Sequence, residues 1–495
     1  MSLETLSAAL LALPGLPLLL AALSVVTRNK ILDRTLLLIW PVCQFVAAAY
    51  LLIRQQEQPV LGHNTGGFEG GVAIAVAADP TTSILLMVTA VATFAAVWFM
   101  TATQETQYRF AAALIFMLVG GVNGALITAD LFNLFVFIEV MLLPSYALIA
   151  ITGGFKRLGI GRMFVIVNLV TSTILVMGVG LVYGVAGTVN LASLAGTTGS
   201  DPVLAAALGV VLLALSIKAG AVPVHGWLPS SYPGTSAGMM ALFSGLHTKV
   251  GVYAVMRVYF VAFDTPAQWQ WVLTVVVLAT MFFGSMLSLG QSTGRGVLSY
   301  QMVSGVGHIL LATVIFTAAA VSAGLFYLVH HIITMGALLL IFGAIEQHYG
   351  PMRLNRFSGF MQQEPLVAFL AAFGLLSLAG LPPTSGLWGK LNLMFAAAGS
   401  GMSALLITVI LAASLVTLLA LMRLYKDVFY GDQAERYLST PSNQIPFRVV
   451  APGAFLILVS VAMFVLAGPI QELTDTAGEV FVDRAQYQQS ILETP

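Results

Sequence analysis

The fold is decided by two stretches of sequence, Lys218-Ala-Gly-Ala-Val-Pro-Val-His-Gly-Trp-Leu-Pro229 and Ala379-Gly-Leu-Pro-Pro-Thr-Ser-Gly-Leu-Trp-Gly-Lys390. In both, an Ala-Gly pair is followed three residues after the glycine by a proline, and then by a tryptophan. Proline removes a backbone donor and glycine relaxes the chain, so a helix that contains this pattern is predicted to break. The predicted break points are Gly220, Pro223, Gly380, Pro382 and Pro383.

Both stretches lie inside apolar runs, 202–231 and 364–399, that are too long for one crossing helix. Unwound backbone at membrane depth is tolerated only where it is buried in protein or lines a wet cavity. A matched pair of interrupted spans therefore points to an ion site between two repeats. The alternative interpretation is a pair of ordinary proline kinks.

The composition of the chain places it in lipid. Of 495 residues, 59% are hydrophobic and 8% charged, and the mean hydropathy is +0.95, whereas a soluble domain carries about 25% charged residues. So few charges could not cover the surface of a soluble protein of this size. The formal net charge is zero and no basic patch exists, which excludes nucleic acid as a partner.

Apolar runs long enough to span a bilayer follow one another along almost the whole chain. The first run ends at Arg28-Asn-Lys30 and has no basic segment before it, so we interpret it as a transmembrane helix and not as a cleaved signal peptide. The sequence predicts an all-α integral membrane protein of about fourteen spans. These spans are 6–26, 35–53, 80–101, 109–129, 131–152, 163–187, 202–231, 236–262, 267–290, 296–318, 322–347, 364–399, 402–425 and 447–468.

Orientation follows from the lysines and arginines of the short loops. With the N-terminus outside, most of these cations fall in loops on the inner side, and the acidic segment after residue 470 falls outside. Both termini are therefore predicted on the outer side.

Three lysines lie within predicted spans: Lys218, Lys249 and Lys390. Each costs about 2.5–3.5 kcal/mol near the bilayer centre, and with Glu139 in span 131–152 the sum is on the order of 10 kcal/mol if they are unpaired. A structural ion pair or a snorkelling side chain is the plain alternative. We favour a proton or ion relay, because burial weakens proton binding by a lysine and a nearby carboxylate strengthens it again. Glu139 is the carboxylate we expect beside Lys218.

Histidines in the same region add proton carriers to the predicted relay: His225, His247, His308, His330 and His331. Their unperturbed pKa near 6.5 suits proton transfer. Taken singly, each could be a hydrogen-bonded core residue, and a bis-histidine haem or metal site is a weaker alternative. The only cysteine is Cys43, so iron–sulfur and structural zinc sites are excluded. We expect no cofactor and no metal.

Several motifs together resemble the antiporter-like subunits of respiratory complex I and of Mrp-type multisubunit cation/proton antiporters. They are the stretch 218–229, Leu246-His-Thr-Lys-Val-Gly-Val-Tyr253 with Arg257, the stretch 377–390, and Asp130-Leu-Phe-Asn-Leu-Phe-Val-Phe-Ile-Glu139. The resemblance covers nearly the whole chain. Asp-Leu-Phe-Asn before the glutamate and Thr-Lys-Val-Gly-Val-Tyr look most like the D-type subunits of Mrp antiporters.

The resemblance implies two inverted repeats of about five helices each. Residues 1–107 would then hold the first three helices, 108–262 the first repeat, 263–425 the second, and 426–495 the last helix with a polar tail. It also implies a Glu139–Lys218 pair, a central Lys249 and an exit Lys390. Complex I relatives often carry a second histidine after Trp-Leu-Pro, where this chain has Ser230.

The expected function is that of a proton-translocating subunit in a Na⁺/H⁺ antiporter of the cell membrane. Its partners would be subunits of the Mrp A, B, C, E, F and G types, together with H⁺, Na⁺ and membrane lipid. One alternative is a proton-pumping membrane subunit of a complex I-type NADH:quinone oxidoreductase, and a second is a non-conducting structural subunit. An intramembrane enzyme is disfavoured, because no metal-ligand set or nucleophile–base set occurs within the spans.

Overall fold

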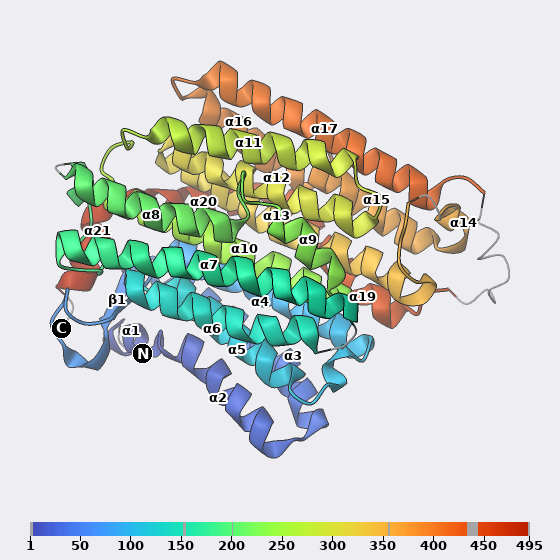
Figure 1. Cartoon of the computed structure of the whole chain (residues 1–495), viewed down its shortest axis with the longest axis horizontal. Helices are drawn as coiled ribbons and strands as arrows, with labels where there is room; N and C mark the ends of the chain where they lie inside the picture. Colours follow the sequence, from blue (N-terminus) through green and yellow to red (C-terminus); the bar gives the residue numbers. More distant parts are fainter. Residues whose placement is uncertain (1–2, 152–154, 200, 355–356, 433–443, 494–495) are drawn as a thin grey trace.

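The computed structural model is almost wholly helical, and it describes residues 3–151, 155–199, 201–354, 357–432 and 444–493. The axes of the long helices are roughly aligned, and the helices form a single bundle (Figure 1). Both chain termini lie at the same end of this bundle, on the left of the view. Parallel helices of this length and apolar character suit a protein whose outer surface faces lipid.

The helices of the bundle, in chain order, are α1 (Leu3–Ala9), α2 (Ala12–Thr27), α3 (Lys30–Arg54), α4 (Pro80–Ala102), α5 (Ala111–Ile127), α6 (Leu131–Ala150), α7 (Phe155–Ala186), α8 (Pro202–Ala219), α9 (Trp227–Ser231), α10 (Ala237–Ala262), α11 (Gln270–Leu289), α12 (Gly294–Ile315), α13 (Ala318–Tyr349), α14 (Phe360–Gln363), α15 (Pro365–Ala379), α16 (Ser385–Ala398), α17 (Ser403–Phe429), α19 (Phe447–Val465), α20 (Ala467–Val482) and α21 (Arg484–Leu492). Two short strands, β1 (Leu61–Asn64) and β2 (Ala75–Ala78), pair antiparallel.

Among the described residues, eleven helices are long and apolar enough to cross a membrane, and the bent pair α1–α2 makes up to twelve. Two further helices, α5 and α15, are apolar but shorter. Every range predicted as a span overlaps a helix or a pair of helices. The all-α membrane architecture is thus confirmed, whereas the count of fourteen crossings stays a prediction.

The helices divide into an inner and an outer group by burial. The span of α10 is 100% buried, that of α13 94% and that of α12 89%, whereas those of α3 and α17 are only 28% and 33% buried. The outer helices therefore present apolar side chains to lipid or to partner subunits. The inner helices α10, α12 and α13 carry the central lysine and most of the histidines.

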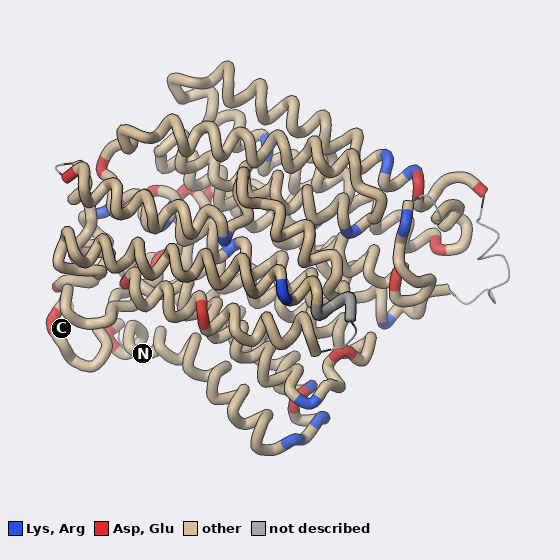
Figure 2. The backbone as a smooth tube through the Cα atoms, viewed as in Figure 1, with Lys and Arg blue, Asp and Glu red and all other residues tan. Residues whose placement is uncertain are grey.

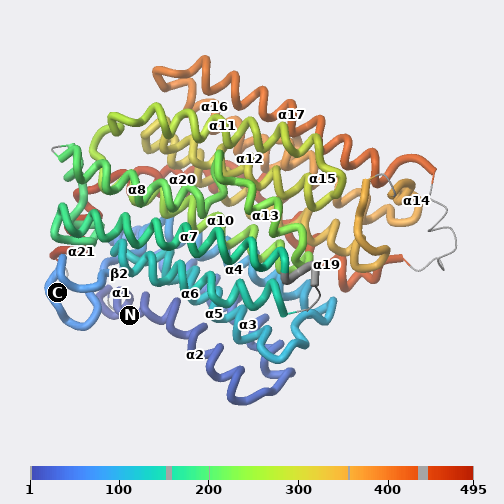
Figure 3. Tube along the Cα trace, viewed as in Figure 1, coloured from blue at the N-terminus to red at the C-terminus, as the bar shows by residue number. Residues whose placement is uncertain are grey.

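The two predicted helix breaks are present. Helix α8 ends at Ala219, and Gly220 follows in the left-handed conformation at φ +85°; α15 ends at Ala379, and Gly380 has φ +87°. Glycine suits both positions because a Cβ would strain this backbone. In each break the next amide bonds back to the last turn of the helix, Ala221 to Ser216 and Leu381 to Leu376, both at 3.0 Å. The chain then continues into α9 and α16 (Figure 3).

The C-terminal segment, for which the sequence predicts only a polar tail, forms the two helices α20 and α21. Helix α20 packs against α13 and α4, and α21 packs against β1. Asn64 donates a hydrogen bond to the carbonyl of Ile491 at 2.9 Å, and Arg484 donates to the carbonyl of Phe260 at 2.8 Å. The segment is therefore packed against, and hydrogen-bonded to, the end of the bundle at which both termini lie.

Candidate functional site

Eight of the nine ionisable residues predicted for the relay come from helices of both halves of the chain, and all of the eight except the half-buried Glu139 are buried. Glu139 lies in α6, Lys218 in the last turn of α8, and His247 and Lys249 in α10. The second half supplies His308 from α12, His330 and His331 from α13, and Lys390 from α16. We call these eight residues the buried row. Its three lysines, Lys218, Lys249 and Lys390, expose 6%, 2% and 5% of their surface, so none of them snorkels to an interface.

A serine connects Glu139 and Lys218. Ser172 of α7 donates a short hydrogen bond to the Glu139 carboxylate, and the Lys218 ammonium donates to the Ser172 Oγ at 3.0 Å. The two charges therefore belong to one network without a direct ion pair. A hydroxyl that accepts from an ammonium and donates to a carboxylate can pass a proton between them.

Lys218 and His247 lie beside each other. A small cavity of about 10 Å³ touches both side chains and is also lined by Asn168, which is close to the space that one water needs. The His247 ring stacks on Phe243 at 4.5 Å between centroids. Its Nε2 lies 2.8 Å from the Ser145 Oγ. These contacts hold the imidazole in place beside Lys218.

Lys249 stands at the centre of the row, in the fully buried helix α10. Its Nζ contacts the hydroxyl of Thr248 at 3.3 Å, and its charge lies within electrostatic range of His331. Gly305 leaves the space that the His331 ring occupies, because a Cβ at this glycine would lie 2.0 Å from Nε2. Close approach of α12 to the imidazole therefore depends on the absence of a side chain at this position.

The far end of the row is an aromatic cluster beside the second break. The rings of His308 and Tyr327 stack at 5.0 Å, and those of Tyr327 and His330 meet edge to face at 5.6 Å. Lys390 donates a hydrogen bond to the carbonyl of Ala379, the last residue of α15, at 2.7 Å. Its charge lies within electrostatic range of both histidines. An unwound helix end thus supplies the oxygen that holds the last lysine.

His225 does not join this row. It lies in the first break, is half-buried, and meets the Tyr300 ring at 6.2 Å, with no hydrogen-bond partner for its Nδ1 among the described residues. Unpartnered ring nitrogens also occur within the row, where His308 and His330 lack a partner at Nε2 and His331 lacks one at Nδ1. Buried polar atoms of this kind ordinarily have a partner or an ordered water.

A buried and a partly buried ion pair stand apart from the row, and no sequence pattern predicted them. Arg257, near one end of α10, is 3% exposed and pairs with Asp79, the N-cap residue of α4. Arg295 pairs with Glu346. The pattern Asp79-Pro80 before an apolar run is a signal for an N-cap, but nothing local connects it to Arg257.

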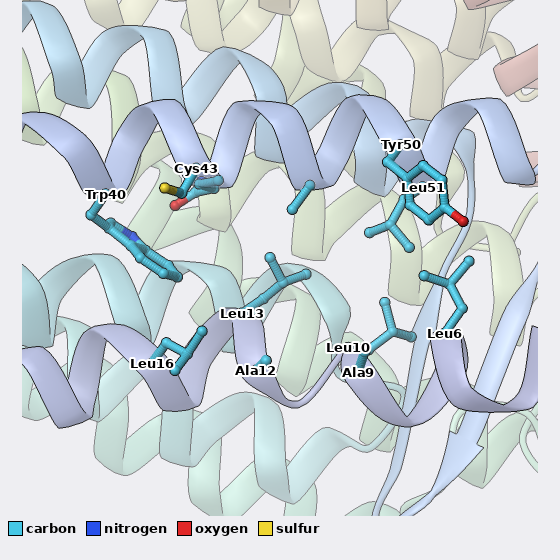
Figure 4. Close-up of a pocket in the computed structure, with 12 residues that line it drawn as sticks. Leu6, Ala9, Leu10, Ala12, Leu13, Leu16, Trp40, Cys43, Tyr50 and Leu51 are labelled. Atoms are coloured by element: carbon cyan, nitrogen blue, oxygen red, sulfur yellow. The ribbon is translucent and has the colours of Figure 1, made fainter. Parts of the chain in front are cut away.

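An apolar cavity of about 260 Å³ lies between α1, α2 and α3, away from the row. Trp40, Cys43 and Tyr50 of α3 face Leu13 and Leu16 of α2 across it (Figure 4). Cys43 is exposed on this surface. Among the described residues, no group of three or more His, Cys, Asp and Glu residues could hold a metal ion.

Comparisons with known proteins agree with this architecture. Residues 128–417 match the family described as NADH:quinone oxidoreductase/Mrp antiporter, transmembrane. The D-type subunit of the Na⁺/H⁺ antiporter of Alkalihalophilus pseudofirmus is 30% identical over 454 residues, which cover 90% of this chain and 92% of that protein.

Two solved structures resemble the whole chain. One is a structure of the Mrp complex from Dietzia sp., with a TM-score of 0.95 and 37% identity over 99% of this chain and 100% of that one. The other, respiratory complex I from Thermus thermophilus, has a TM-score of 0.79 at 20% identity over 95% of this chain and 99% of that one, and shares the fold. Since the matched family region covers more than half of the sequence, the chain belongs to the NADH:quinone oxidoreductase/Mrp antiporter transmembrane family.

Proposed function

We propose that the chain is the D-type membrane subunit of a multisubunit Na⁺/H⁺ antiporter, and that it moves protons along the buried row. The similarity to the D-type subunit of a Na⁺/H⁺ antiporter over most of both chains supports the type of transporter. The chain assembles with the other Mrp-type subunits of that complex in the cell membrane. The observation that carries the proton route is the Glu139–Ser172–Lys218 network together with the two further buried lysines.

Energetics favour a working role for these lysines over a structural one. Each lysine at the bilayer centre costs about 2.5–3.5 kcal/mol. Lys249 and Lys390 have no carboxylate partner among the ion pairs of the described residues, so no structural salt bridge offsets that cost. An intramembrane ionisable group retained without a partner points to ion transport.

In the proposed mechanism a proton enters near Lys218, where Glu139 balances its charge. It passes His247 and Lys249, reaches the histidine cluster, and leaves by Lys390. The charge of each lysine repels a proton on the next, so occupancy propagates along the row. One charge crossing 100 mV gains about 2.3 kcal/mol, which equals less than two pKa units. Small rearrangements can therefore couple the membrane potential to exchange.

The orientation that we propose places both termini on the outer side. Lysines and arginines gather at the end of the bundle opposite the termini, on the right of Figure 2. Positive loops remain on the cytoplasmic side of a membrane. The helices α20 and α21 would then face the outside.

The alternative is a proton-pumping membrane subunit of a complex I-type NADH:quinone oxidoreductase, with the same fold and the same lysines. The likeness to complex I shows this fold at 20% identity, so it does not favour that function over antiport. A passive scaffold is the other alternative, and it predicts that substitutions in the row leave exchange unchanged. Neighbouring genes distinguish the first alternative: small membrane antiporter genes support our proposal, and hydrogenase-like and flavoprotein genes oppose it.

The experiment that tests the function measures Na⁺/H⁺ exchange in everted vesicles that contain the whole complex. Glu139→Ala and Lys218→Ala should each abolish exchange while the complex still assembles. Normal exchange in either variant, at normal complex levels, would refute the proposed route.

A further inference from the structure

Four hydroxyl groups from four helices meet beside the second helix break. They belong to Ser377 near the end of α15, Ser385 at the start of α16, Thr334 of α13 and Ser460 of α19, and all four are 0% exposed. Ser385 and Ser460 are 2.8 Å apart, and Ser377 lies 3.3 Å from each of them. Thr334 lies 3.4 Å from Ser377 and 3.5 Å from Ser460. We call these four groups the hydroxyl cage.

The cage hydroxyls are turned away from their own helices. Elsewhere in the bundle, buried hydroxyls donate to the carbonyl one turn back, as Ser145, Thr171 and Thr274 do at 2.7–3.0 Å. In the described chain, none of the four cage residues makes such a bond. Their oxygens point at one another, although the three residues that lie inside helices, Thr334, Ser377 and Ser460, each have a carbonyl one turn back.

The cage holds more close contacts than it has protons to fill them. Including the ring nitrogen Nδ1 of His330, which lies 2.8 Å from Ser385 and 3.2 Å from Thr334, seven contacts join five groups. Four hydroxyls supply one proton each, and the imidazole nitrogen supplies at most one. The four contacts at 3.3–3.5 Å are longer than ordinary O–H···O hydrogen bonds, so they leave oxygen lone pairs without a close donor, and such lone pairs can coordinate a cation.

The spacing of the oxygens suits a small cation. Adjacent oxygens around an ion held at about 2.4 Å in octahedral geometry are about 3.4 Å apart, and four of the cage pairs lie 3.3–3.5 Å apart. The cage contains no carboxylate, so it could not balance a divalent charge out of water. Ser377 lies in the last turn of α15, whose C-terminal end favours a cation, whereas Ser385 begins α16, whose N-terminal end does not.

We propose that the hydroxyl cage is a binding site for a dehydrated monovalent cation, with Na⁺ as the ion that an exchanger of this type carries. This inference rests on the proposed function and deepens it, because it locates the counter-ion of the proton beside Lys390. The amine of Lys390 is not a ligand, since it donates to the carbonyl of Ala379. Ser460 comes from α19, a helix outside both expected repeats, and it contacts cage hydroxyls, not a residue of the row.

The test compares Ser460→Ala and Ser377→Ala with Ser460→Thr and Thr274→Val in the whole complex, reconstituted in vesicles. Loss of one oxygen ligand should raise the half-saturating Na⁺ concentration about tenfold or more, while the maximal rate stays near that of the wild type. Ser460→Thr keeps the hydroxyl and should recover most of the affinity. Thr274 donates only within its own helix, so Thr274→Val should leave Na⁺ affinity unchanged.

Two outcomes would overturn the cation site. An unchanged half-saturating Na⁺ concentration in both alanine variants would show that these oxygens do not bind the ion. Loss of proton movement at every Na⁺ concentration would show that they serve proton transfer instead. A failed proton route has a different signature, because Lys218→Ala would then retain exchange while Ser460→Ala still shifted the Na⁺ dependence.

Discussion

Replacing Ser172 by alanine removes the group through which Glu139 and Lys218 meet. Its hydroxyl bonds to both charges in a buried position. A hydrogen bond to a charged group contributes about 1.5–3 kcal/mol, and about 1.4 kcal/mol corresponds to a factor of ten in rate. Glu139 is only half-buried, so we take the lower part of this range and expect exchange to fall at least about tenfold.

The assay is Na⁺-driven dissipation of a proton gradient in everted vesicles that contain the whole complex. Thr171→Val is the matched control, because Thr171 lies next in sequence and its hydroxyl donates only to the carbonyl of Val167 at 2.7 Å. Ser172→Thr retains a hydroxyl and should keep most of the activity. Wild-type exchange in Ser172→Ala, at equal complex levels, would refute the claim that the serine joins the two charges functionally.

Three further substitutions test packing, two beside the row and one at the buried ion pair that stands apart from it. Gly305→Ala places a Cβ about 2.0 Å from the present position of the His331 ring, so exchange should be lost although immunoblots show normal complex; unchanged exchange would contradict this. Gly380→Ala places an alanine in the left-handed conformation and brings its Cβ within 2.6 Å of the Lys390 side chain. Both exchange and thermal stability should therefore fall. An unchanged melting temperature would argue against strain. Arg257→Met leaves Asp79 buried without its partner, which should lower the stability of the fold by about 3–5 kcal/mol. This cost would be refuted if the variant complex had the same abundance and the same melting temperature as the wild type.

The helix breaks could be predicted from the sequence because their cause is local. A glycine that must adopt positive φ and a proline without an amide lie within a few residues of each other, so the pattern is visible at Gly220 and again at Gly380. The burial of the three lysines could be predicted in the same way, since each stands alone among apolar residues of one span.

Contacts between helices that are distant in the sequence could not be predicted from such local patterns. Ser172 was missed because serine is common in transmembrane helices, and only the packing of α6, α7 and α8 brings it between Glu139 and Lys218. The hydroxyl cage was missed for the same reason. His225 was predicted as a relay residue because it lies next to a break; its ring meets that of Tyr300 at 6.2 Å, and its part in proton transfer stays a prediction.

The measurement that most directly tests the account is simultaneous recording of Na⁺ and H⁺ flux through the whole complex with Lys249→Met. Lys249 occupies the centre of the buried row and has no carboxylate partner in the described chain. A route through this amine predicts that both fluxes disappear together from fully assembled complex. Coupled exchange at the wild-type rate would contradict the route.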